Sequence, residues 1–122
     1  MITHPDFEYV GKGVMKHDIG IVKLRNEMEI NDYIKPVCLP TARDDIPNPN
    51  EAGWAIGWGI TKNRGPSNHK LKQVGVQIVE ENSCRRKVDG FPDSGRGLIC
   101  GGGSYGHDTC VGDSGGPVLG YR

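Results

Sequence analysis

The chain has 122 residues, and its 15 Lys and Arg balance 15 Asp and Glu, so its formal net charge is zero. This balance gives no sign of a nucleic-acid partner or of a strongly charged partner of either sign. The apolar runs are far shorter than the roughly 20 residues that cross a membrane, and residues 1–6 do not resemble a secretory signal. With 19 Gly, 8 Pro and 35% hydrophobic residues, the composition indicates a turn-rich protein.

Three stretches predict β-strands. Residues 18–24 form a short apolar run, which is typical of a strand buried on both faces. Residues 52–59 form a second run, with glycines where backbones bend or approach closely. Residues 71–79 alternate with period two, so one face carries Val74, Val76 and Ile78.

Proline- and glycine-containing loops separate these stretches, at 41–50 and 61–68. One short helix is predicted through residues 84–87, capped by Asn82 or Ser83 and carrying basic residues toward its C-terminal end. The sequence therefore predicts an all-β, antiparallel, barrel-like fold.

The four cysteines, at positions 38, 84, 100 and 110, contain no C-x-x-C pair and no histidine at zinc-finger spacing. We therefore expect disulfides and an oxidising compartment, and no metal or organic cofactor.

The most informative segment is Gly-Asp-Ser-Gly-Gly-Pro at 112–117. A serine hydroxyl attacks a carbonyl well only from a sharp, exposed turn beside a base and backbone N–H donors. Gly112 and Gly115 permit such a turn. The motif resembles the signature of the chymotrypsin/trypsin family of serine proteases, and it implies that Ser114 is the nucleophile and that Gly112 and Ser114 supply the oxyanion-hole N–H groups.

Other segments resemble the same family, in the same chain order. Asp18, at the start of the 18–24 run, matches the aspartate that orients the catalytic histidine, and we expect its carboxylate to be shielded. Further matches are Lys35–Pro40, Gly57–Gly59 and Leu98–Gly102. The resemblance covers essentially the whole chain.

Two more aspartates acquire roles from this resemblance. Asp108 matches the residue at the base of the primary pocket, where a buried carboxylate selects a substrate Arg or Lys. Asp113 matches the residue that pairs with the new N-terminal amine after zymogen cleavage and thereby forms the oxyanion hole.

The resemblance implies only part of a trypsin-like double antiparallel β-barrel. Residues 1–34 would be the end of the first barrel, 35–51 the linker, and 52–122 an incomplete second barrel; a whole domain needs roughly 200–250 residues. The catalytic histidine is expected outside the chain, and none of His4, His17, His69 and His107 is expected to act as the base. The chain alone is therefore expected to be inactive.

The resemblance also pairs the cysteines. Cys84 and Cys100 match a local disulfide, whereas Cys38 and Cys110 match cysteines whose partners would lie outside the chain. Many relatives join cysteines at the positions of Gly53 and Gly120. Their paired replacement, with residues 67–72 and 100–103, is similar to arthropod clip-domain proteases.

We therefore expect a secreted trypsin-like endopeptidase, made as a zymogen of an immune or clotting-type cascade. Its expected partners are protein substrates with Arg or Lys at the cleaved bond, serpin-type inhibitors and an activating protease. One alternative is a protease homologue that binds partners without catalysis, and another is a truncated product with no function of its own.

Overall fold

The computed structural model describes residues 1–11, 13–41, 48–92, 97–102 and 106–120. The chain divides into two compact units, Met1–Ile46 and Pro47–Arg122. This division falls within the segment 35–51 that the sequence suggested as a linker. The assignment of the units to two barrels remains a prediction.

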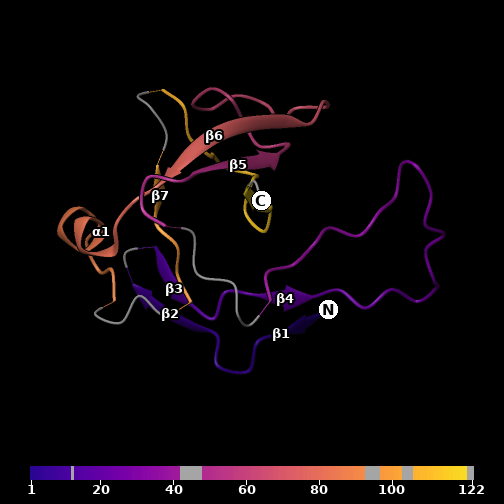
Figure 1. Cartoon of the computed structure of the whole chain (residues 1–122), viewed down its shortest axis with the longest axis horizontal. Helices are drawn as coiled ribbons and strands as arrows, with labels where there is room; N and C mark the ends of the chain where they lie inside the picture. The colour runs from indigo at the N-terminus through magenta and orange to yellow at the C-terminus, as the bar shows by residue number, and fades with distance from the viewer. Residues whose placement is uncertain (12, 42–47, 93–96, 103–105, 121–122) are drawn as a thin grey trace. The chain divides into compact units, whose positions relative to one another are not determined.

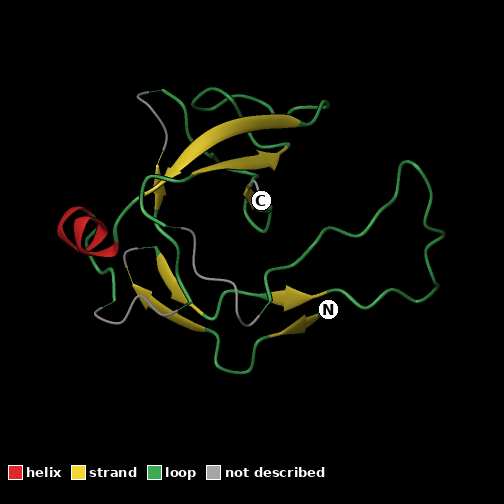
Figure 2. Cartoon of the chain, in the orientation of Figure 1, coloured by secondary structure: helices red, strands yellow, loops and turns green. Residues whose placement is uncertain are grey.

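The first unit contains two small antiparallel sheets (Figure 1). β1 (Ile2–Thr3) pairs with β4 (Gly20–Ile21), and β2 (Glu8–Gly11) pairs with β3 (Val14–Lys16) in a hairpin. Residues 22–41 then run as one long loop (Figure 2).

The second unit is built on a four-stranded antiparallel sheet in the order β7-β6-β5-β8. Its central strands are β5 (Ala52–Gly57) and β6 (Lys72–Ile78), and its edge strands are β7 (Gly101–Gly102) and β8 (Val118–Gly120). In the described part of the chain, all the buried apolar side chains lie in this unit: Ala55, Val76, Ile78 and Cys84. The strands predicted at 52–59 and 71–79 are thus confirmed, with the alternation of β6 directed as expected.

The prediction for residues 18–24 was wrong in length and burial. Only Gly20–Ile21 forms a strand, and Ile19, Val22 and Leu24 are 66%, 68% and 54% exposed. The physical reason is that β4 has only a very short pairing partner. Among the described residues it pairs with the two-residue strand β1 alone, and so short a ladder covers neither face of the apolar run.

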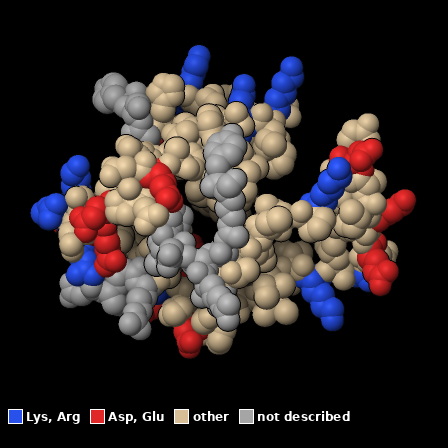
Figure 3. Space-filling view, in the orientation of Figure 1, with Lys and Arg blue, Asp and Glu red and all other residues tan. Residues whose placement is uncertain are grey.

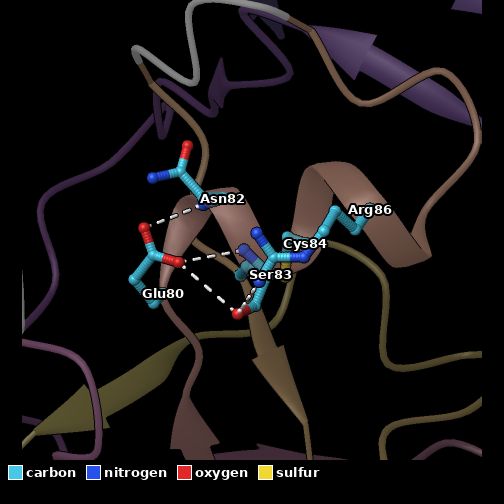
Figure 4. Close-up of a disulfide and its surroundings, with 6 residues drawn as sticks. Glu80, Asn82, Ser83, Cys84 and Arg86 are labelled. Atoms are coloured by element: carbon cyan, nitrogen blue, oxygen red, sulfur yellow. Dashed lines mark hydrogen bonds between the residues drawn. A yellow bond between two sulfur atoms is a disulfide. The ribbon is translucent and has the colours of Figure 1, made fainter.

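The helix α1 (Glu81–Lys87) begins before the predicted position. Its N-cap is Glu80, whose carboxylate accepts hydrogen bonds from the backbone N–H groups of Asn82 and Ser83, both at 3.0 Å (Figure 4). Asn82 and Ser83 therefore lie in the first turn as donors and are not the cap. The predicted basic residues do occupy the last turn.

The cap lowers the pKa of Glu80 from its ordinary value, chiefly through the hydrogen bond from Asn82. Partial desolvation opposes this effect, while the bonds from Ser83 and the charge of Arg86 add to it.

The expected disulfide between Cys84 and Cys100 is present. It joins the middle of α1, where Cys84 is 3% exposed, to the residue that precedes β7. The backbone N–H of Val79 also donates to the carbonyl of Cys100 at 2.8 Å. The helix is therefore bound to one edge of the sheet.

The expectation of an all-β antiparallel fold is confirmed, with α1 the single helix among the described residues. No helix in this part of the chain is long and apolar enough to cross a membrane. Acidic and basic side chains are both distributed over the visible face (Figure 3). Residues 42–47 of the predicted loop at 41–50 lie outside the described residues, as does residue 103 of the segment 100–103.

Candidate active site

Ser114 lies on a tight, exposed turn between β7 and β8. The backbone N–H of Asp113 donates to the carbonyl of Cys110 at 3.0 Å, and that of Gly116 donates to the carbonyl of Asp113 at 2.9 Å. Two successive turns thus flank the serine, and its side chain is solvent-exposed. A nucleophile needs this accessibility to reach a substrate carbonyl.

The two glycines beside Ser114 have backbone angles that other residues rarely adopt. Gly112 has φ 96° and Gly115 has φ 80°, both in the left-handed region. A side chain at Gly112 would also place a Cβ 3.1 Å from the Cα of Gly59. Both glycines are therefore required by the turn that presents the serine.

The backbone N–H groups of Gly112 and Ser114 donate to no acceptor within the described part of the chain. Both residues are exposed, so these two N–H groups are accessible to water or to another acceptor.

Asp113 is half-buried, and its carboxylate joins two distant segments. Its Oδ1 accepts from the backbone N–H of Gly59 at 2.8 Å, and its Oδ2 accepts from that of Cys110 at 3.0 Å. A Cβ at Gly59 would lie 2.6 Å from the carboxylate, and one at Gly57 would come closer still. The glycines around Trp58 are therefore required because the carboxylate occupies the adjoining space.

A cavity of about 540 Å³ opens beside this carboxylate. Both aspartates of the loop border it, together with residues of β5, β6 and the loop between them. Its lining includes Gly57, Gly59, Lys62, Lys72, Asp108 and Asp113.

Asp108 borders this cavity but is not buried, contrary to the expectation from sequence. Its side chain is exposed, and its Oδ1 accepts from the backbone N–H of Thr109 at 2.8 Å. The carboxylate is held by its own loop, and residues 106–111 are all exposed. A short local hydrogen bond of this kind is typical of an aspartate in a turn.

Asp18 belongs to the other unit, two residues before β4. Its carboxylate is exposed, whereas the sequence predicted a shielded one. The reason is the same as for the apolar run after it, since the two-residue pairing of β1 with β4 covers nothing beyond the strand itself.

The histidines divide between the units. His4 and His17 lie in the first unit with their rings stacked, a contact that the sequence analysis missed. His69 and His107 are exposed in the second unit, and His107 borders the cavity. His4 and His17 are 13 residues apart in sequence, so no local spacing signalled the stacked pair.

Cys38 and Cys110 are free and exposed. No group of three or more potential metal ligands occurs among the described residues.

An exposed serine on a turn with left-handed glycines on both sides has the accessibility that a nucleophile needs. The family model for trypsin matches residues 1–120. The chain belongs to the trypsin family of serine proteases.

Similar curated proteins agree with this family assignment. The chain is 38% identical to a mouse tryptase, over 98% of this chain and 45% of that protein. It is 39% identical to the Spaetzle-processing enzyme of Drosophila melanogaster, over 85% of this chain and 26% of that enzyme. It is 33% identical to the clip-domain serine protease B14 of Anopheles gambiae, over 97% of this chain and 34% of that protease.

A solved structure supports the fold. Mouse neuropsin, a serine protease expressed in the limbic system, superposes with a TM-score of 0.83 at 32% identity, covering 98% of this chain and 52% of that one. The expected trypsin-like architecture is thereby confirmed. The chain spans about half the length of neuropsin and half or less of the curated relatives it matches.

Proposed function

We propose that this chain is the nucleophile-bearing part of a trypsin-like serine endopeptidase that cleaves peptide bonds after Arg or Lys. The observation that carries this proposal is the turn at 110–116, which exposes Ser114. The N–H groups of Gly112 and Ser114 beside it donate to no acceptor among the described residues. The Asp113 carboxylate fixes the base of this turn against Gly59.

The reaction proceeds through an acyl-enzyme. The Ser114 hydroxyl oxygen attacks the substrate carbonyl carbon, and its proton passes to a histidine base. The carbonyl oxygen becomes an oxyanion that accepts hydrogen bonds from Gly112 and Ser114. The base then donates the proton to the leaving amine, and a water molecule releases the acyl group by the same steps. Asp18 orients the base.

The base is supplied by sequence beyond these 122 residues. His4 and His17 stack on each other, and neither His69 nor His107 has a carboxylate partner among the described hydrogen bonds and ion pairs. The chain by itself is accordingly inactive, and a longer form that contains the histidine is the active protein.

Asp108 selects the substrate side chain. A carboxylate on the loop that carries the nucleophile offers a counter-charge to a substrate cation. Asp108 is exposed in this chain, and the proposal assigns the remaining wall of the pocket to other parts of the complete protease.

Asp113 is the activation switch. The cavity of about 540 Å³ beside its carboxylate has room for a chain terminus, and an ammonium group there would pair with the carboxylate. This supports synthesis as a zymogen. Its natural setting is then a secreted proteolytic cascade, with an activating protease upstream and serpin-type inhibitors. Relatives named for clip domains and for Spaetzle processing favour this setting.

The test is turnover of a fluorogenic peptide ending in Arg, measured for the 122-residue chain and for the longer protein. We expect no cleavage by the chain and robust cleavage by the activated longer protein. Ser114→Ala in the longer protein should abolish activity, whereas the matched variant Ser67→Ala should leave it unchanged. A peptide ending in Phe should be cleaved poorly, and Asp108→Ser should lower kcat/KM on the Arg peptide about a thousandfold. Robust turnover by the chain alone would show that the base lies within it.

The rival proposal is that the longer protein is a non-catalytic protease homologue. It predicts that the longer protein has a residue other than histidine at the position of the base, and that it binds protein partners without cleaving the Arg peptide. The coding sequence that precedes Met1 distinguishes these alternatives, and a start codon without upstream coding sequence would instead indicate a truncated product.

A further inference from the structure

Asn68 lies in the loop between β5 and β6 and donates twice to the segment that follows β5 (Figure 1). Its backbone N–H donates to the carbonyl of Trp58 at 3.0 Å, and its side-chain Nδ2 donates to the carbonyl of Gly59. A carbonyl oxygen only accepts hydrogen bonds, so the nitrogen of the carboxamide is the atom that faces Gly59. One residue thus binds two successive carbonyl groups.

The N–H groups of the same two peptide bonds face the turn at 110–116. The N–H of Gly59 donates to Asp113 Oδ1 at 2.8 Å, and the N–H of Ile60 donates to the carbonyl of Val111 at 2.9 Å. The C=O of one residue and the N–H of the next belong to one planar group and point in opposite directions in a trans peptide. None of the described peptide bonds is cis. Asn68 therefore holds the far ends of the two peptide planes whose near ends bind the turn that carries Ser114.

Burial makes the side-chain bond of Asn68 important. Gly59 is buried and Asn68 is half-buried, so water has limited access to this carbonyl. A buried carbonyl ordinarily has a hydrogen-bond donor, and within the described part of the chain that donor is the Asn68 carboxamide. Without it, rotation of the Gly59–Ile60 peptide plane toward water would satisfy the carbonyl but turn the Ile60 N–H away from Val111.

We propose that Asn68 is a positioning residue for the turn that presents Ser114. It acts through Gly59 and Ile60, which it orients toward Asp113 and Val111, and it does not contact the substrate. Its kinetic consequence rests on the proposed function of Ser114 as the nucleophile. Because the turn carries the attacking hydroxyl, loss of Asn68 should lower kcat and leave KM nearly unchanged.

The decisive variants are Asn68→Asp and Asn68→Ala. The aspartate keeps the shape of the side chain but replaces the donor with an oxygen that repels the Gly59 carbonyl, whereas alanine removes the side chain. If Asn68 only fills space, Asn68→Asp should behave as the parent does. The matched control is Ser67→Ala, at the neighbouring exposed position.

The first measurement is amide hydrogen exchange by NMR on the 122-residue chain. In both decisive variants we expect exchange on the order of tenfold faster at Gly59 and Ile60, and faster exchange at Asp113 within the turn. Ser67→Ala should match the parent. Parent-like protection of Gly59 and Ile60 in Asn68→Asp would overturn the proposal, with or without catalytic activity in the longer protein.

Two controls separate this effect from general unfolding. The N–H of Val79 donates to the carbonyl of Cys100 in the same unit, so its protection should be unchanged. The milder variant Asn68→Gln keeps the donor on a longer side chain and should lose less protection at Gly59 than Asn68→Ala does. Equal loss of protection at Val79 and Gly59 in all three variants would contradict a local role.

The second measurement is kinetics of the activated longer protein on the Arg peptide. Small displacements of reacting groups cost up to about 100-fold in rate, so we expect kcat to fall about 10–100-fold in Asn68→Asp and Asn68→Ala. An unchanged kcat, or a change confined to KM, would overturn the positioning role and leave the proposed function intact. Failure of the parent to cleave would instead contradict the proposed function, and hydrogen exchange at Gly59, Ile60 and Asp113 would then decide whether Asn68 holds the turn.

Discussion

The carboxylate of Asp113 accepts a hydrogen bond from the backbone N–H of Gly59, 54 residues earlier in the chain, at 2.8 Å. This bond joins the turn that carries Ser114 to the segment just after β5. It also explains why residues 57 and 59 are glycines, since any side chain at either position would enter the space of the carboxylate. The geometry of the Ser114 turn thus depends on a distant strand.

Gly59→Ala should displace the Asp113 carboxylate, because the new Cβ would lie 2.6 Å from it. Overpacking of this kind costs about 1–3 kcal/mol, and we expect a loss in this range in the free energy of unfolding in urea. Gly120→Ala is the control, since nothing lies within 4 Å of a Cβ built there. Equal losses for the two variants would contradict the close contact with Asp113.

Asp113→Asn should weaken the turn even though it preserves the shape of the side chain. An amide has one carbonyl oxygen, so only one of the two N–H groups, from Gly59 and Cys110, keeps its acceptor. We expect a loss of about 1–3 kcal/mol in stability and faster hydrogen exchange at one of these two amides. Unchanged protection of both amides would show that the carboxylate is not their acceptor.

A double change to cysteine at Gly53 and Gly120 should form a disulfide. The two glycines are directly opposite each other in the antiparallel pair of β5 and β8. Opposite residues have Cα atoms about 4.5–5.5 Å apart, within the range of roughly 4.4–6.8 Å that disulfides span. A Cβ at Gly53 would lie 3.1 Å from Val118 Cγ1 and 3.3 Å from the carbonyl oxygen of Leu119, so both the Val118 side chain and the backbone of β8 must shift slightly.

We expect this crosslink to stabilise the chain by about 2–4 kcal/mol. Mass spectrometry and thiol counting detect the bond, and thermal unfolding with and without reductant measures its effect. The single variant Gly53→Cys serves as the control. Free thiols in the oxidised double variant would contradict the register of β8 against β5.

The start of α1 should depend on pH through Glu80. Its folded pKa is lowered, chiefly by the hydrogen bond from Asn82, so its contribution is fully present above the unfolded pKa and is lost as pH falls through the folded one. Between about pH 6 and pH 3 we therefore expect loss of amide protection at Asn82 and Ser83. Glu80→Gln should remove this pH dependence, whereas Glu27→Gln should preserve it.

The sequence predicted features that depend on local chemistry. Glycines at 112 and 115 flank the serine because the turn requires left-handed angles, and the alternation of residues 72–78 follows from the pleat of a strand with one buried face. The all-β fold could be inferred from such patterns, and the motif at 112–117 indicated the family. The Cys84–Cys100 pairing was implied by the resemblance to that family.

Only the tertiary structure decided what depends on pairing between distant segments. The register of β5 with β8 placed Gly53 opposite Gly120, the acceptor role of Asp113 required Gly59 beside it, and the pairing of β1 with β4 brought His4 against His17. The exposure of Asp18 and Asp108 likewise depends on which segments pack over each residue, and the sequence does not give this. Spacing along the chain does not encode these distances, because they are set by strand register and by the layers that pack above each strand.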